Sequence, residues 1–383
     1  MSELFGNHGG EKKVEYIELI YDLIFVYIIG RNNSLLHTIE NGFIGAETYF
    51  AYIISTLVIL HVWYFTVLFI NRYGSNGFAE YLCIFINMYL LYYMADGTRV
   101  HWQEFYVRYN VAWGLILINL GVQYLIKLKK SGRLMPWQDK HLKYNMYMLF
   151  TEAVIVFASI PLYMVTKIPF APLAMVFGMI ASIAKRDVDK LMSVDFAHLT
   201  ERVMLYVVFT FGEMIIGIAG YFEGGFSFNS IYFSLMAFLI VAGLFLCYGY
   251  FYDNVIDRES ETAGVGYMFI HIFLITALNN ITVALEFMRE PEVNDVPKNV
   301  FMVASMVVYF TFLFLTERYA KPHLRISKRY FAFLGLISLA FICAMALSYK
   351  YAYISIAATV IYIYAVFVSH YLYCKKRNKE IAE

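Results

Sequence analysis

The amino-acid sequence predicts an all-α integral membrane protein, a polytopic bundle of about 12 transmembrane helices. Of its 383 residues, 61% are hydrophobic and 15% are charged, whereas soluble domains average about 45–50% and about 25%. The mean hydropathy is +0.59. Windows of about 20 apolar residues, long enough to cross a bilayer, recur along the whole chain. A soluble all-α protein could not bury so much apolar surface in one core.

The predicted spans follow from these windows and from the polar residues between them. The first has Glu18 and Asp22 near its start and no small-residue cleavage site after it, so it is a retained span rather than a signal peptide. The sixth begins with Pro169 and Pro172 and either crosses the membrane or forms a re-entrant segment. The twelve segments are 15–36, 48–70, 78–97, 106–127, 144–166, 169–185, 198–220, 229–252, 264–288, 299–317, 330–348 and 351–373.

The distribution of Lys and Arg predicts the orientation of these helices. If both termini are cytoplasmic, the cytoplasmic segments hold 22 of the 30 Lys and Arg residues, and the opposite ends hold 7, with Arg202 inside a span. This bias fits the positive-inside rule, and one wrong helix in the middle of the chain would scramble it. The sequence therefore predicts a multi-pass protein of the cytoplasmic membrane with both termini in the cytoplasm.

Two short segments predict an internal duplication. ELIYDLIFV, residues 18–26, aligns with ERVMLYVVF, residues 201–209, at the start of the first and seventh helices. Six helices in each half give both halves the same orientation, which is a parallel repeat about an axis along the membrane normal. The repeats would cover residues 1–190 and 191–383. The alternative is two unrelated helices that each begin with an acidic residue.

Ionisable residues within the first apolar segment indicate an ion-binding site, because such residues are costly in hydrocarbon. Glu18 and Asp22 are four residues apart, so they share one face of a helix. Two carboxyl groups that face each other in a low dielectric do not both ionise easily, which favours binding of a proton or a cation. The alternative is an interfacial role, since both residues lie in the first turns of the helix.

The seventh helix has a stripe of polar residues on one face. At about 100° per residue, His198, Arg202 and Glu213 fall within a narrow arc, and Glu201 lies on its flank. Arg202 stays charged and requires carboxylate partners. The alternative to an ion path is a structural ion pair between the two halves. His198 and Glu201 have the spacing of di-metal carboxylate bundles, but the first helix has no matching His, so no metal site is predicted.

Secondary candidate residues lie in other spans or at their ends. Arg72 and Asp253 end the second and eighth helices, where such residues are more often interfacial than gating. A lone intramembrane His is more often a packed hydrogen-bonding group than a cavity residue. The secondary candidates are Asn71, Arg72, Glu152, Asp253 and His271. His61 is a weaker candidate.

Several functional classes lack support in the sequence. A net charge of +1 gives no indication of a nucleic-acid partner. The sequence has no GxxxxGK[ST] phosphate-binding motif and no TVGYG selectivity filter. Its four Cys form no CxxC pair and indicate buried thiols. No cofactor is predicted. The expected partners are membrane lipids, a proton or small cation, and a second copy of the chain if the aromatic surface forms dimer contacts.

ELIYDLIFV (18–26) and HLTERVMLYVVFTFGE (198–213) resemble the two signature stretches of the bacterial low temperature requirement A (LtrA) family of polytopic membrane proteins. WYFTVLFINRY (63–73) and FYD (251–253) resemble its second helix and the end of its eighth. Val203 and Met204 depart from the Phe-Gly of the family pattern. The resemblance implies no defined biochemical activity. The matching residues are Glu18, Asp22, Asn71, Arg72, His198, Glu201, Arg202, Gly212, Glu213 and Asp253.

The sequence favours a secondary transporter or ion-conducting protein rather than an enzyme. In this hypothesis, the carboxylates of the first and seventh helices bind protons or a cation in a polar cavity, with Arg202 biasing their charge and His198 at the cytoplasmic mouth. One alternative is a membrane-embedded enzyme that acts on a lipid or isoprenoid, which needs a lateral opening and a cavity of acyl-chain dimensions. The other is a non-catalytic membrane scaffold or sensor.

Overall fold

A computed structural model of the chain describes residues 13–75, 77–96, 102–130, 135–190, 192–223 and 226–382. The described residues are mostly helical and form two compact units, which confirms the all-α fold class. Lys12, Arg99 and Arg133, which contribute to the charge bias, lie outside the described residues. The predicted duplication into residues 1–190 and 191–383 stays a prediction, because the two units describe packing and not ancestry.

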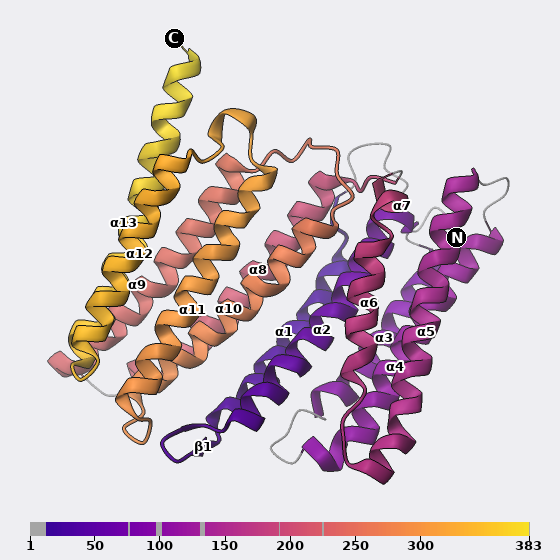
Figure 1. Ribbon diagram of the computed structural model, residues 1–383, viewed down its shortest axis with the longest axis horizontal. Helices are drawn as coiled ribbons and strands as arrows, with labels where there is room; N and C mark the ends of the chain where they lie inside the picture. Colours follow the sequence, from indigo (N-terminus) through magenta and orange to yellow (C-terminus); the bar gives the residue numbers. More distant parts are fainter. Residues whose placement is uncertain are drawn as a thin grey trace. The chain divides into compact units, whose positions relative to one another are not determined.

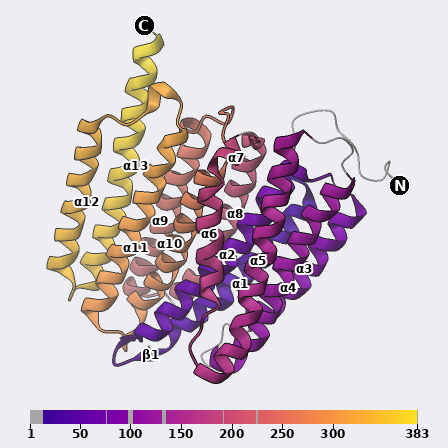
Figure 2. The same cartoon turned by 45° about the vertical axis from the view of Figure 1, so that its right-hand side comes forward.

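Unit 1 comprises the chain up to Thr38, Ala46–Tyr206 and Glu261–Met268. Figures 1 and 2 show α3, α4 and α5 of this unit side by side. The elements of unit 1 are α1 (Tyr16–Asn33), the 3-10 helix η2 (Ser34–His37), α2 (Ala46–Tyr73), α3 (Phe78–Asp96), α4 (Trp102–Lys130), α5 (Pro136–Thr166), α6 (Pro172–Ala184), α7 (Arg186–Lys190) and the start of α8 (Phe196–Gly217).

Helix α2 forms the centre of unit 1. Every residue from Val58 to Asn71 is buried, so the helix is surrounded by protein on all sides. Helix α1, in contrast, is buried on one face only, and the large apolar side chains on its other face are exposed. A surface of that kind is suited to contact with lipid. The exposed residues of α1 are Tyr16, Ile20, Leu23 and Tyr27.

Small residues allow α4 and α5 to approach closely. A Cβ atom on Gly114 would lie 2.7 Å from the ring of Phe157, and one on Gly121 would lie 2.7 Å from the ring of Phe150. The two glycines are seven residues apart, and so are the two phenylalanines. The two rings of α5 therefore fit against two glycines on one face of α4. This packing fixes the two longest helices of unit 1 against each other.

Unit 2 comprises Ile39–Gly45, Val207–Ser260 and Phe269–Glu383. Its helix α13 packs along α9 and α12, and the yellow C-terminal end of α13 extends past α12 (Figures 1 and 2). Its elements are the end of α8, the 3-10 helix η3 (Ile218–Phe222), α9 (Phe228–Tyr250), the π-helical turn η4 (Phe251–Val255), α10 (Val265–Arg289, which begins in unit 1), α11 (Asp295–Leu315), the 3-10 helices η5 (Thr316–Tyr319) and η6 (Pro322–Leu324), α12 (Lys328–Ser348) and α13 (Ala352–Ala382).

A short antiparallel hairpin also belongs to unit 2, although α1 and α2 on either side of it belong to unit 1. Strand β1 (Ile39–Glu40) pairs with β2 (Phe43–Ile44). The turn is Asn41–Gly42, and both residues have positive φ, 53° and 85°, as a type I′ turn requires. The backbone N–H of Asn294 donates to the carbonyl of Gly42 at 2.7 Å. The sequence analysis did not predict this hairpin.

Each of the twelve predicted spans coincides with a helix, but the number that crosses the membrane is not confirmed. Among the described residues, ten helical segments are long and apolar enough to cross a membrane. Helix α1 contains three charged residues, Glu18, Asp22 and Arg31, within 18 residues. Helix α6 has 13 residues, or about 20 Å, which is shorter than a hydrocarbon core of about 30 Å.

We expect Gly121→Leu to destabilise the protein, because a larger side chain would displace the Phe150 ring from the α4–α5 interface. Overpacking of this kind costs about 1–3 kcal/mol of the free energy of unfolding. Thermal unfolding of the purified protein in detergent measures the change. Gly335→Leu is the matched control, since it is also in a helix and a Cβ atom there has nothing within 4 Å. Equal effects of the two substitutions would contradict the packing described above.

Candidate functional site

Four of the six ionisable residues predicted on the first and seventh helical spans, Glu18, Asp22, His198 and Arg202, meet in the interior of unit 1. Glu18 and Asp22 lie one turn apart on the buried face of α1, and Arg202 lies on α8. All three side chains are at most 1% exposed. Together with Trp63 and Asn71 of α2 and His198 of α8, they form a group of contacting side chains that we call the Arg202 cluster.

Asp22 is held by three hydrogen bonds. Arg202 Nε donates to Asp22 Oδ2 at 3.0 Å, and Arg202 Nη2 donates to Asp22 Oδ1 at 3.0 Å. This is the two-pronged arrangement that gives an Arg–carboxylate pair both strength and a fixed geometry. The Trp63 indole Nε1–H donates to Asp22 Oδ1 at 2.9 Å, and the Trp63 ring packs against Tyr206 of α8 at 4.5 Å between centroids.

Glu18 joins Arg202 to His198. Arg202 Nη1 donates to Glu18 Oε2 at 2.7 Å, and His198 Nε2 lies 3.4 Å from Glu18 Oε1. Both His198 and Glu18 are the third residue of their helices, so the contact lies near the first turn of α8 and of α1.

Asn71 fixes the orientation of the His198 ring. The Asn71 amide oxygen accepts from the backbone N–H of Asp195 at 3.0 Å, and its Nδ2 donates to the carbonyl of Asp195 at 2.9 Å. The same Nδ2 is 3.0 Å from His198 Nδ1. Because the amide group is oriented by these backbone bonds, His198 Nδ1 is the acceptor and the ring proton lies on Nε2, facing Glu18.

The Arg202 cluster contains two carboxyl groups and one guanidinium. One guanidinium balances one carboxylate, and the second carboxyl group requires a proton or another positive charge if it is to remain buried. His198 Nε2, 3.4 Å from Glu18 Oε1, is the nearest further group that could carry a positive charge. The polar cavity predicted between the first and seventh helices is not found at these residues: in the part of the chain that the structure describes, the charged groups are buried and contact one another.

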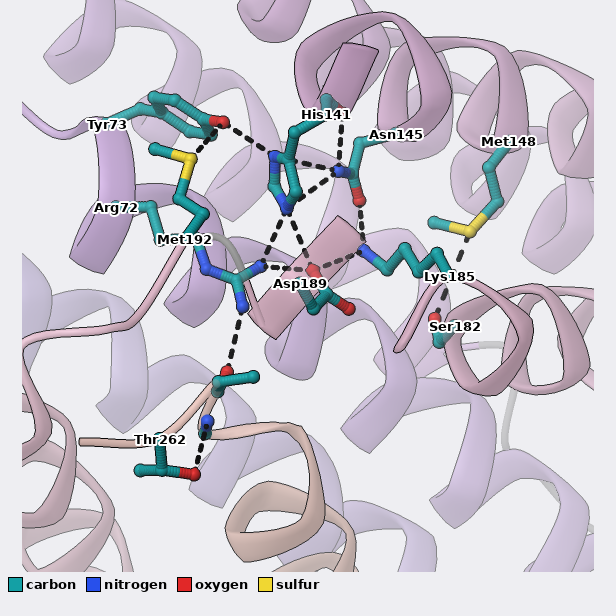
Figure 3. Close-up of polar contacts among 12 residues, drawn as sticks. Arg72, Tyr73, His141, Asn145, Met148, Ser182, Lys185, Asp189, Met192 and Thr262 are labelled. Atoms are coloured by element: carbon teal, nitrogen blue, oxygen red, sulfur yellow. Dashed lines mark hydrogen bonds and ion pairs between the residues drawn. The ribbon is translucent and has the colours of Figure 1, made fainter. Parts of the chain in front are cut away.

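A second buried group, which we call the Asp189 cluster, lies where α2, α5, α6 and α7 meet (Figure 3). Three donors converge on Asp189 Oδ1: His141 Nε2 at 2.8 Å, Arg72 Nη1 at 3.0 Å and Lys185 Nζ at 3.7 Å. All four side chains are at most 2% exposed. Further hydrogen bonds join Tyr73 to His141, Lys185 to Asn145, and Arg72 to the carbonyl of Ala263.

Two pKa shifts follow from the packing of the Asp189 cluster outside the spans. Burial alone would raise the pKa of Asp189, but the His141 hydrogen bond and the charges of Lys185 and Arg72 outweigh it and lower the pKa. Burial lowers the pKa of Lys185 to about 8, because desolvation disfavours its charged form more than Asp189 stabilises it. Lys185 can therefore change charge near neutral pH.

A third buried pair lies along α2 and α5. His61 Nε2 is 3.0 Å from Glu152 Oε2, with exposed fractions of 3% and 0%. Gly178 of α6 leaves room for the pair, since a Cβ atom there would collide with the Glu152 carboxyl group. His141, Asn145 and Glu152 are spaced along one buried face of α5, so the pair continues the line of polar residues that begins in the Asp189 cluster.

The other predicted site residues do not join the Arg202 cluster. Glu201 is half-buried on α8, beside the cluster. Glu213 is half-buried in the part of α8 that belongs to unit 2.

Asp253 is on the surface of unit 2, 3.4 Å from Arg258, and is 69% exposed. His271 Nε2 is 3.3 Å from the Tyr248 hydroxyl in unit 2. Arg72 is in the Asp189 cluster.

Sequence reasoning missed most of the Asp189 cluster. Lys185 is four residues before Asp189, a spacing that places both on one helix face, but Lys185 was counted only as a loop charge. Nothing in the sequence indicated which residues His141 and Trp63 would contact.

Among the described residues, no group of three or more His, Cys, Asp and Glu side chains is arranged to hold a metal ion.

We expect Arg202→Gln to lower the free energy of unfolding by about 3–5 kcal/mol, because it leaves two buried carboxyl groups without their shared cation. Chemical or thermal unfolding in detergent measures the effect. Glu201→Gln, on the adjacent and half-buried residue, is the control and should change stability by less than about 1 kcal/mol. A similar small effect of both substitutions would show that the cluster does not hold α1 against α8.

We expect Lys185 to make stability depend on pH. Its pKa in the native protein is about 8 and its ordinary value is 10.5. Between these values the unfolded chain binds more protons than the native protein, so the contribution of Lys185 to stability rises with pH and is largest above 10.5. Unfolding measured from pH 7 to pH 10 should therefore show a steeper rise for the wild type than for Lys185→Met. Parallel curves would contradict this assignment.

Comparison with protein-family models matches residues 13–367 to the family described as bacterial low temperature requirement A protein (LtrA). Searches of curated proteins and of solved structures give no match. The matched range contains every residue of the Arg202 and Asp189 clusters, and it confirms the resemblance drawn from ELIYDLIFV and HLTERVMLYVVFTFGE. The chain therefore belongs to the bacterial low temperature requirement A (LtrA) family of membrane proteins.

Proposed function

We propose that this LtrA-family protein is a secondary transporter or ion-conducting protein in which Glu18 and Asp22 bind a proton or a small cation. The supporting observation is the unequal number of charges in the Arg202 cluster. Two carboxyl groups, each at most 1% exposed, share one guanidinium. Since an uncompensated buried charge is costly, a bound proton or cation would balance the second carboxyl group.

Glu18 is the carboxyl group that we expect to exchange the ion. Glu18 is the carboxyl group beside a titratable ring: its Oε1 lies 3.4 Å from His198 Nε2, and its Oε2 accepts from Arg202 at 2.7 Å. Asp22 is bound by Arg202 and Trp63. A proton passed from His198 Nε2 to Glu18 would weaken the Glu18–Arg202 pair and leave the Asp22–Arg202 pair intact. The cluster would then have two states that differ in one ion pair, as a transport cycle requires.

The closed cluster corresponds to an occluded state in this proposal. Loss of the Glu18–Arg202 pair would open a polar cavity between the starts of α1 and α8, and Glu201 and Glu213 would be the next carboxylates along α8. His198 would act at the cytoplasmic mouth, because it is in the first turn of α8.

The protein would lie in the cytoplasmic membrane with both termini in the cytoplasm. The charge bias of the loops supports this orientation. Four of the basic residues behind this bias lie within five positions in the last turns of α13: Lys375, Lys376, Arg377 and Lys379. A basic segment of this kind favours the side of the membrane with anionic lipid headgroups.

The test is proton or cation flux into liposomes that contain the purified protein. We expect Glu18→Gln and Asp22→Asn to reduce flux by about tenfold or more, which corresponds to a barrier increase of about 1.4 kcal/mol. Glu201→Gln is the matched control on the neighbouring residue and should retain most of the flux. Glu213→Gln should reduce flux if the path continues along α8. Circular dichroism checks that each variant keeps its helical content.

Two outcomes would overturn the proposal. Wild-type protein that carries no proton, sodium or potassium under any imposed gradient would favour the lipid-enzyme and scaffold hypotheses. Flux that is unchanged in both Glu18→Gln and Asp22→Asn, with folding intact, would make the Arg202 cluster a structural ion pair.

A further inference from the structure

Unit 1 contains an apolar cavity that the Arg202 and Asp189 clusters do not use. Its volume is about 290 Å³, close to the lower end of the range typical of ligand sites. It lies among α2, α4 and the segment that joins α5 to α6. The lining residues that matter here are Glu47, Ala51, Val58, Tyr109, Trp113 and Lys167.

Two helices form the walls of the cavity, and the lining residues have the same spacing on both. Residues 51, 54, 55 and 58 of α2 and residues 106, 109, 110 and 113 of α4 line it, so each helix presents one continuous face over two turns. The wall is held in place by Tyr106, whose hydroxyl accepts from the backbone N–H of Ala171 at 3.2 Å and whose ring stacks on Tyr163 at 3.9 Å. The cavity is therefore preformed.

The mouth of the cavity has one charge of each sign. Glu47, in the first turn of α2, and Lys167, at the end of α5, both line the cavity and are exposed. Helix ends of this kind lie near the membrane surface, where lipid headgroups are found. A ligand with a cationic and an anionic group at one end and an apolar chain at the other would match this arrangement.

We infer that the cavity binds one zwitterionic phospholipid, with an acyl chain between α2 and α4, its ammonium group at Glu47 and its phosphate at Lys167. An anionic phospholipid would place its negative head beside Glu47, and a small ion would gain little from the apolar walls. This inference goes beyond the proposed transport of ions and does not depend on it, because binding is measured without a gradient.

The test is native mass spectrometry of the purified full-length chain with phosphatidylethanolamine or phosphatidylglycerol added. We expect the wild type to retain one phosphatidylethanolamine and to bind it about tenfold more tightly than phosphatidylglycerol. Glu47→Gln and Lys167→Gln should each weaken phosphatidylethanolamine binding by about tenfold. Both side chains are exposed, so these variants should fold.

Two further variants locate the site. Ala51→Phe should abolish binding by occupying the cavity, and it lies on a half-buried position near the mouth. Lys350→Gln is the matched control for Lys167→Gln, because each lysine is exposed and has its Nζ over a tyrosine ring, at 5.6 Å and 5.8 Å respectively. It should leave binding unchanged.

Equal binding of the two lipids by the wild type would overturn the headgroup assignment. Unchanged phosphatidylethanolamine binding in folded Ala51→Phe would overturn the cavity as the site. Either result would leave the proposed transport through the Arg202 cluster to be judged by the flux assay alone.

Discussion

A guanidinium buried in a membrane-embedded helix bundle constrains the packing of unit 1. Arg202 stays charged in protein interiors and must be surrounded by acceptors. Its partners Glu18 and Asp22 lie about 180 positions earlier in the chain, so their ion pairs fix the start of α8 against the start of α1. The Trp63 hydrogen bond to Asp22 adds α2 to the same contact. One buried charge thus positions three helices.

Helix α2 connects the buried polar groups of unit 1. Four of its residues have different partners. His61 contacts Glu152, Trp63 contacts Asp22 of α1, Asn71 contacts the N-terminus of α8, and Arg72 is in the Asp189 cluster. The Arg202 cluster has one carboxyl group more than it has guanidinium groups, and Arg72 and Lys185 in the Asp189 cluster share one carboxylate.

The charged clusters and the apolar cavity occupy different ends of the same helices. Glu47 is in the first turn of α2, and Arg72 lies one residue before its end. Lys167 follows α5, and His141 is in its second turn. Unit 1 therefore combines an apolar site at one end of α2 and α5 with the buried ionisable groups of the Asp189 cluster at the other, and the His61–Glu152 pair lies between them.

The sequence by itself determined the helical segments and the ionisable residues of the Arg202 cluster, because hydrophobic windows and ionisable residues within them are local features that the membrane makes costly or favourable. Glu18, Asp22, His198 and Arg202 were identified in this way. The Asp189 cluster depended on tertiary structure: Lys185 and Asp189 resemble ordinary loop charges until packing against α2 and α5 removes them from water. The hydrogen bond from Trp63 to Asp22 likewise forms only because the fold brings α2 against α1. The hairpin at Asn41–Gly42, in contrast, has a local cause in the Asn-Gly pair, and tertiary structure decides only its contact with Asn294.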